Sequence, residues 1–103
     1  MNLQELTGYE SGVVVFKESN KGIAINWSSI EGIPRIFVTG VIGLGDGDDL
    51  QTVEENDVDQ DLIDTALELA KEDHVNNNVK EDPEIDGMWE NNECIIVTFD
   101  GWA

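Results

Sequence analysis

Apolar residues in the first 40 positions fall into short runs that are separated by polar or glycine-containing breaks. Val13–Phe16 is a β-branched run, and it is followed by a polar turn. Ile23–Trp27 alternates, which places its two isoleucines and its tryptophan on one face of a strand. A third run, Arg35–Thr39, follows Pro34, a residue that can open a strand but cannot sit inside one. The short connections favour an antiparallel meander.

The period of the apolar residues changes in the middle of the chain. From Asp57 to about His74 they recur three and four positions apart, which predicts an amphipathic helix. Asp57 or Asp59 can cap its first turn, where acids also suit the helix dipole. Lys71 lies near its carboxy-terminal end, where cations are favoured. The preceding segment, Leu50–Asn56, is expected to be loop or a frayed approach to this helix.

The final part of the chain combines an acidic segment with two β-prone runs. Lys80–Gly87 is expected to be an acidic loop, Met88–Trp89 a short strand and Glu93–Phe99 the last strand. The element order is then β-β-β-α-β-β. We predict an α+β fold in a single domain spanning 1–103, with one amphipathic helix packed on a mostly antiparallel sheet of four to five strands. The alternative is a small open barrel whose end is plugged by the helix.

Charge divides the chain into two unlike parts. The sequence has 23 acidic and 5 basic residues, a net charge of −18. Up to Gly40 there are four acids and three bases, whereas from Val41 onward there are nineteen acids and two bases. Such a surface repels phosphates, which excludes direct binding to nucleic acid or to an anionic membrane. Because solubility needs a net charge of only about 2–8 in magnitude, the excess indicates a surface that binds a basic partner.

Three acidic segments are candidates for that surface. A stripe on the predicted helix lies opposite the apolar face, within about 80° at the usual 100° per residue. Like charges at these spacings each cost a few tenths of a kcal/mol, so the stripe favours a docking role over the alternative of an ordinary solvated face. The stripe comprises Asp57, Asp61, Asp64, Glu68 and Glu72, and the two flanking loops contribute Asp46, Asp48 and Asp49 and then Glu81, Asp82, Glu84 and Asp86.

A calcium site is the first alternative use of these acids. Asp57, Asp59, Asp61 and Glu68 match positions 1, 3, 5 and 12 of an EF-hand loop. Leu62, however, occupies the position at which the sharp turn requires glycine, and the helical period runs straight through the segment. We therefore expect no metal site there. Weak calcium binding by the acidic loops stays open as an alternative.

Signals for catalysis are absent from the sequence. Gly43–Asp48 lacks the third glycine of a phosphate-binding loop, and its aspartates would repel a phosphate. Cys94 and His74 have no catalytic motif around them, and a single cysteine allows neither an internal disulfide nor a zinc cluster. We expect no enzymatic activity and no cofactor. Trp27 is expected in the core, while Trp89 and Trp102 are candidates for exposed interface anchors.

In charge and length the chain resembles the DNA-mimic inhibitors that phages and mobile elements use against restriction, CRISPR and repair enzymes. It also resembles immunity proteins that neutralise nuclease toxins. The resemblance implies an acidic inhibitor whose carboxylates stand in for phosphates on the basic surface of a nucleic-acid-binding protein or nuclease. The alternative is a non-inhibitory acidic interaction module, with or without calcium binding. We expect a cytoplasmic monomer or small homo-oligomer, because no apolar run approaches membrane-spanning length and no leader is evident.

Overall fold

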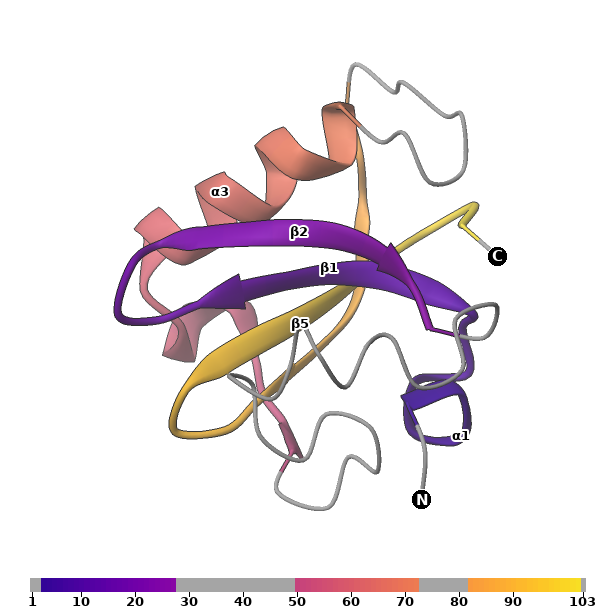
Figure 1. Ribbon diagram of the computed structural model, residues 1–103, viewed down its shortest axis with the longest axis horizontal. Coiled ribbons are helices and arrows are strands. Elements are labelled where there is room, and N and C mark those ends of the chain that lie inside the picture. The colour runs from indigo at the N-terminus through magenta and orange to yellow at the C-terminus, as the bar shows by residue number, and fades with distance from the viewer. Residues whose placement is uncertain (1–2, 28–49, 73–81, 103) are drawn as a thin grey trace.

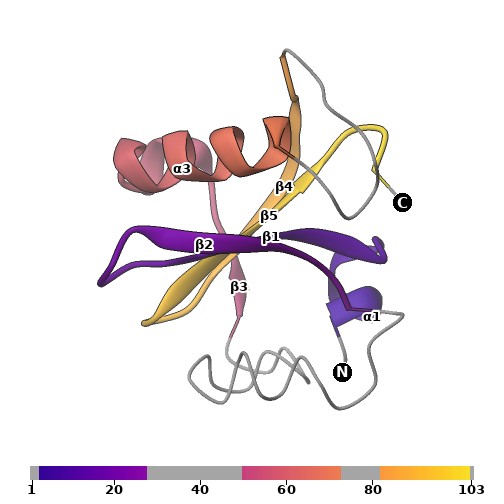
Figure 2. The same cartoon turned by 45° about the horizontal axis from the view of Figure 1, so that its top comes forward.

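The computed structural model describes residues 3–27, 50–72 and 82–102. These residues form an α+β fold, in which the helix α3 (Gln60–Lys71) covers one face of a five-stranded antiparallel sheet (Figures 1 and 2). A short helix, α1 (Leu3–Thr7), precedes the sheet, and a 3₁₀ turn, η1 (Glu55–Asp57), precedes α3. The strands are β1 (Ser11–Phe16), β2 (Lys21–Asn26), β3 (Gln51–Thr52), β4 (Ile85–Glu90) and β5 (Cys94–Phe99).

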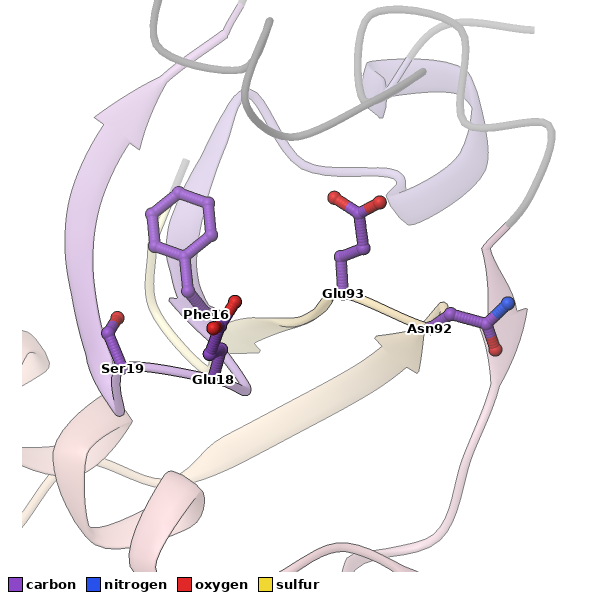
Figure 3. Close-up of a pocket in the computed structure, with 5 residues that line it drawn as sticks. All are labelled: Phe16, Glu18, Ser19, Asn92 and Glu93. Carbon is purple, nitrogen blue, oxygen red and sulfur yellow. The ribbon is translucent and has the colours of Figure 1, made fainter.

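The sheet is assembled from two hairpins that meet at its centre. Its strand order is β2-β1-β5-β4-β3, so the last strand lies beside the first. In the register of the central strands, Val14 faces Ile23 of β2 on one side and Ile96 of β5 on the other. The turn that joins β1 to β2 and the turn that joins β5 to β4 are consequently neighbours at one end of the sheet (Figure 3).

The predicted order β-β-β-α-β-β is confirmed, with changes at particular elements. The third described strand is Gln51–Thr52, within a segment that we expected to be loop, and the expected strand Arg35–Thr39 lies outside the described residues. The expected acidic loop was too long, because Ile85–Gly87 belongs to β4. The helix is shorter than predicted and begins at Gln60. The described strands form an open sheet with β2 and β3 at its edges. The strands β1 and β2 form the antiparallel hairpin expected of the first two runs, and the third run of the expected meander lies outside the described residues.

The central strands are buried on both faces, which explains why their sequences are continuous apolar runs. Val13 and Val15 pack toward α3, where they meet its buried residues Leu62 and Ala66. Val14 points to the opposite face, into a second cluster that the sheet separates from the first. The helix therefore covers the larger of the two clusters and leaves the smaller one on the other face of the sheet, and every residue of β5 is buried.

Three tryptophans complete the two clusters. Trp27 is half-buried against the second cluster and donates a hydrogen bond from Nε1 to the carbonyl oxygen of Tyr9 (2.8 Å). A Cβ at Gly12 would lie 2.5 Å from the Trp27 ring and 2.8 Å from the Val97 carbonyl oxygen, so only glycine fits beneath the indole. Trp102 is only 5% exposed and packs on Phe99 at a ring-centroid distance of 5.1 Å.

This position contradicts the expectation that Trp102 is an exposed anchor. Its place in the core follows from the large apolar area that its indole buries beside Phe99. Trp89 is half-buried against the second cluster.

None of the helices in the described ranges 3–27, 50–72 and 82–102 has the length and apolar character that a membrane span requires.

Candidate docking surface

The outer face of α3 is a row of carboxylates. Asp61, Asp64, Glu68 and Glu72 are exposed and lie on the side of the helix opposite its buried residues. At a rise of about 1.5 Å per residue the row is about 16 Å long, with one carboxylate every 5–6 Å. Gln60 Nε2 donates a hydrogen bond to Asp64 Oδ1 (2.9 Å), so Asp64 is held along the helix surface. The sequence-predicted stripe is therefore present in these four members.

Asp57, the fifth predicted member, does not belong to the helical row. It lies in η1, and the following residue, Val58, has an extended backbone that separates η1 from α3. Asp59 is the residue that caps the helix, because its side chain accepts a hydrogen bond from the backbone N–H of Asp61 (3.1 Å). The apolar period continues through Val58, which is buried, and this explains why the pattern suggested an earlier helix start.

The acidic surface nevertheless extends beyond the amino-terminal end of the helix. Glu54, Glu55, Asp57 and Asp59 are all exposed and immediately precede α3. Sequence reasoning did not include Glu54 and Glu55, although their adjacency to the helix was visible in the chain. From Glu54 to Glu72 the protein thus presents eight exposed carboxylates and one exposed base, Lys71. We call this segment the acidic ridge.

The ridge does not have the geometry of a calcium-binding loop. Between Asp59 and Glu68 the chain is continuous helix, so it makes no turn that could bring the EF-hand positions around one ion. Among the described residues, no group of three or more histidine, cysteine, aspartate or glutamate side chains is placed to hold a metal ion. The ridge is an extended row of charges along one side of the helix and the segment before it.

The second acidic segment lies before β4 and at its start. Asp82 and Glu84 precede β4, and Asp86 lies at the irregularity in the pairing of β4 with β5; all three are exposed. The ridge helix packs over β1, β2 and β5, whereas β4 lies beyond β5. The start of β4 nevertheless lies beside the carboxy-terminal end of α3 in both views (Figures 1 and 2), and Ile85 packs in the same cluster as the buried residues of α3, so this segment borders that end of the row. Asp46, Asp48, Asp49 and Glu81 lie outside the described residues.

Asp86 is additionally engaged by a tyrosine. The Tyr9 hydroxyl donates a hydrogen bond to Asp86 Oδ2 (2.6 Å) and links the start of β1 to the start of β4. This bond to the carboxylate raises the pKa of Tyr9 to about 12, with smaller contributions from burial and from the charges of Asp86 and Asp100. Asp86 thus has a structural partner, which makes it less available to a docking protein than the members of the ridge.

A hollow between two hairpin turns was not anticipated from the sequence. Phe16, Glu18 and Ser19 line it from the β1–β2 side, and Asn92 and Glu93 line it from the β4–β5 turn (Figure 3). In the close-up the Phe16 ring and the Glu93 carboxylate point in the same direction from opposite turns, whereas Asn92 points away. Because the two turns are more than 70 residues apart in sequence, only the pairing of β1 with β5 brings them together.

Cys94 is placed in the core and not in an accessible site. It is fully buried in β5, opposite Phe16 in the register. Burial is the main reason that its pKa rises to about 12; the Glu93 charge raises it further and Lys17 opposes this effect. A thiol in this setting keeps its proton at neutral pH, and a protonated thiol is a poor nucleophile.

The carboxylates outside the ridge include one that is neutralised. Lys17 Nζ lies 3.0 Å from Glu90 Oε2, and each side chain is 33% exposed. The pair ties the β1–β2 turn to the end of β4.

Comparison with known proteins adds no functional assignment to this geometry: no family model, no curated protein and no solved structure matches the chain.

Proposed function

We propose that this protein is an acidic inhibitor that occupies the basic surface of a nucleic-acid-handling protein. The observation that carries the proposal is the acidic ridge, in which eight exposed carboxylates accompany a single base on and just before α3. The lysines and arginines that normally hold phosphates would bind these carboxylates instead. Charge-assisted hydrogen bonds from such cations to carboxylates are stronger than neutral ones.

The arrangement of the ridge supports an extended, phosphate-binding partner surface. Its helical carboxylates are spaced by 5–6 Å, whereas one strand of B-DNA carries a charge every 3.4 Å along its axis. The exposed acids Glu54, Glu55, Asp57 and Asp59 raise the charge density at one end of the row. A rigid helix held by a packed core presents these charges with little loss of conformational freedom on binding.

The electrostatic character of the whole chain supports the same proposal. A net charge of −18 on 103 residues attracts a basic surface over several ångströms and accelerates association. Such attraction weakens as salt is added, since the Debye length falls from about 30 Å at 0.01 M to about 8 Å at 0.15 M. Inhibition that depends steeply on salt is therefore an expected property.

Inhibition assays with purified enzymes test the proposal. The chain is added at increasing ratios to a restriction endonuclease, an RNA-guided nuclease, a DNA-repair glycosylase and a toxin nuclease, and DNA cleavage or base excision is measured. We expect inhibition of at least one enzyme, weakening as salt rises from about 50 to about 300 mM. The double reversal Asp64→Lys/Glu68→Lys should lower the inhibitory potency by at least tenfold.

A second double reversal controls for net charge. Glu5→Lys/Glu10→Lys changes the charge by the same amount at exposed positions on and after α1, away from the ridge. Asp64 and Glu68 serve as the ridge variant because both are exposed and lie in the middle of the row on α3. An equal loss of inhibitory potency in both variants would show that only the net charge matters and that the ridge has no special role. If the chain inhibited none of the enzymes, the proposed function would be contradicted.

A further inference from the structure

We propose that the hollow between the β1–β2 and β4–β5 turns binds the guanidinium group of an arginine side chain that the basic partner presents. The inference rests on the proposed function and extends it, because it adds a specific pocket to a surface that otherwise attracts by charge. The residues that carry it are Phe16, Glu18 and Glu93, all of which line the hollow (Figure 3).

The walls of the hollow are held in place before any ligand arrives. The backbone N–H of Lys17 donates to the carbonyl oxygen of Glu93 (2.8 Å), which joins the two turns directly. Asn91 Oδ1 accepts hydrogen bonds from the N–H groups of Glu93 (2.8 Å) and Cys94 (2.9 Å) and so fixes the β4–β5 turn. Asn20, whose φ of 52° is left-handed, donates its N–H to the Phe16 carbonyl oxygen (2.9 Å) and closes the other turn.

The charge of the hollow is negative despite the nearby lysine. Glu18 and Glu93 are exposed, one on each turn. The Lys17 ammonium is 3.0 Å from Glu90, so it is paired with a third carboxylate and not with either of these two. A cation that enters the hollow therefore meets one carboxylate from each turn.

The Phe16 ring distinguishes this hollow from a simple acidic patch. It is half-buried, packs against the second core cluster and leaves part of its surface facing the hollow. An aromatic face attracts a cation, and the planar guanidinium can stack on it while its edge donates to carboxylates. A lysine ammonium lacks the planar face, and its stronger hydration opposes entry beside an aromatic ring. The combination of one ring and two flanking carboxylates therefore favours arginine.

The test uses N-acetyl-arginine amide as the probe and ¹⁵N-labelled full chain as the target. We expect saturable changes in the amide signals of Ser19 and Glu93, with binding in the millimolar range that a single charged side chain supports. N-acetyl-lysine amide should bind at least about threefold more weakly. Glu93→Gln, at an exposed position, should weaken arginine binding by about fivefold, and Phe16→Leu should remove the preference for arginine over lysine.

Glu68→Gln is the matched control, since it also removes one exposed carboxylate but lies on the ridge. The proposal would be overturned if the signal changes were spread over all acidic segments. It would also be overturned if Glu93→Gln and Glu68→Gln weakened binding of the arginine probe equally. Probe binding at the hollow by a chain that inhibits no enzyme would instead contradict the proposed function alone. Enzyme inhibition that depends on the ridge, without any probe binding at the hollow, would contradict this inference alone.

Discussion

Cys94 shows how burial decides the chemistry of a single residue. In the sequence it has no catalytic motif around it and stands at the start of an apolar run. In the structure its thiol is fully buried between β1 and β4, and its pKa rises to about 12 mainly because the charged thiolate is poorly solvated there. The buried neutral thiol therefore has consequences for stability at alkaline pH.

We expect the free energy of unfolding to fall as the pH rises above 9. The pKa of Cys94 is about 12 in the folded protein and near its ordinary 9.0 in the unfolded chain. Below pH 9 both states hold the proton; above it the unfolded state loses its proton first, which favours unfolding by up to about 1.4 kcal/mol per pH unit. Urea denaturation between pH 8 and 10 measures this slope.

Cys94→Ala provides the control for this titration. The variant loses side-chain volume and is less stable at every pH, but it lacks the titrating thiol, so its stability should decline less steeply. The window ends at pH 10 because the pKa of Tyr9, which is also raised above its ordinary 10.0, adds a similar effect beyond that point. Parallel declines in the wild type and in Cys94→Ala would contradict the prediction.

At the scale of elements, α3 is the part that the sequence predicted best. Its apolar spacing predicted both its existence and the face that it buries, and Leu62, Ile63, Ala66 and Ala70 are indeed buried. The start of the helix was less well determined, because Asp57 and Asp59 both precede an apolar residue and both suit a cap. Backbone geometry distinguishes them: Asp57 ends η1, and Asp59 accepts the hydrogen bond of the capping position.

Asp59→Ala should destabilise the protein by about 1 kcal/mol, within a range of 0.5–2, because the first turn loses a hydrogen-bond acceptor. Asp57→Ala is the matched control: it removes the same charge two residues earlier and should change stability by no more than about 0.5 kcal/mol. Chemical denaturation of the two variants at one salt concentration compares them. Equal destabilisation would mean that the cap contributes nothing beyond its charge.

At the scale of the whole molecule, the charge is the dominant feature. Exposed carboxylates occur on the ridge, before β4 and in the turns, and Lys17 neutralises Glu90. Charges of one sign repel each other more when they are brought together by folding, so they oppose the compact state. The acidic surface is thus a cost to stability, and a binding role offers a physical reason for it.

The melting temperature should consequently be higher in about 0.5 M sodium chloride than at about 20 mM, since the Debye length becomes shorter than the distances between many of the carboxylates. Calorimetry or circular dichroism measures the shift. Repeating the series with potassium chloride distinguishes screening, which depends only on ionic strength, from binding of a particular ion. A flat response would show that the carboxylates are spaced too widely to repel one another effectively.

The sequence by itself determined the fold class, the acidic face of the helix and the apolar runs that become the buried central strands β1 and β5. These properties follow from local periodicity, which places a residue on one face of its own helix or strand whatever lies beyond it. It also predicted the last strand, because a continuous run of β-prone residues is suited to a buried position.

Only the tertiary structure decided which strands are neighbours. The placement of β5 beside β1 follows from non-local packing, which no local pattern in the chain specifies. This single pairing buries Cys94 and brings the turns with Glu18 and Glu93 to the same end of the sheet. The acidic ridge could therefore be predicted from spacing along one helix, whereas the hollow depended on two distant segments and became visible only in the assembled sheet.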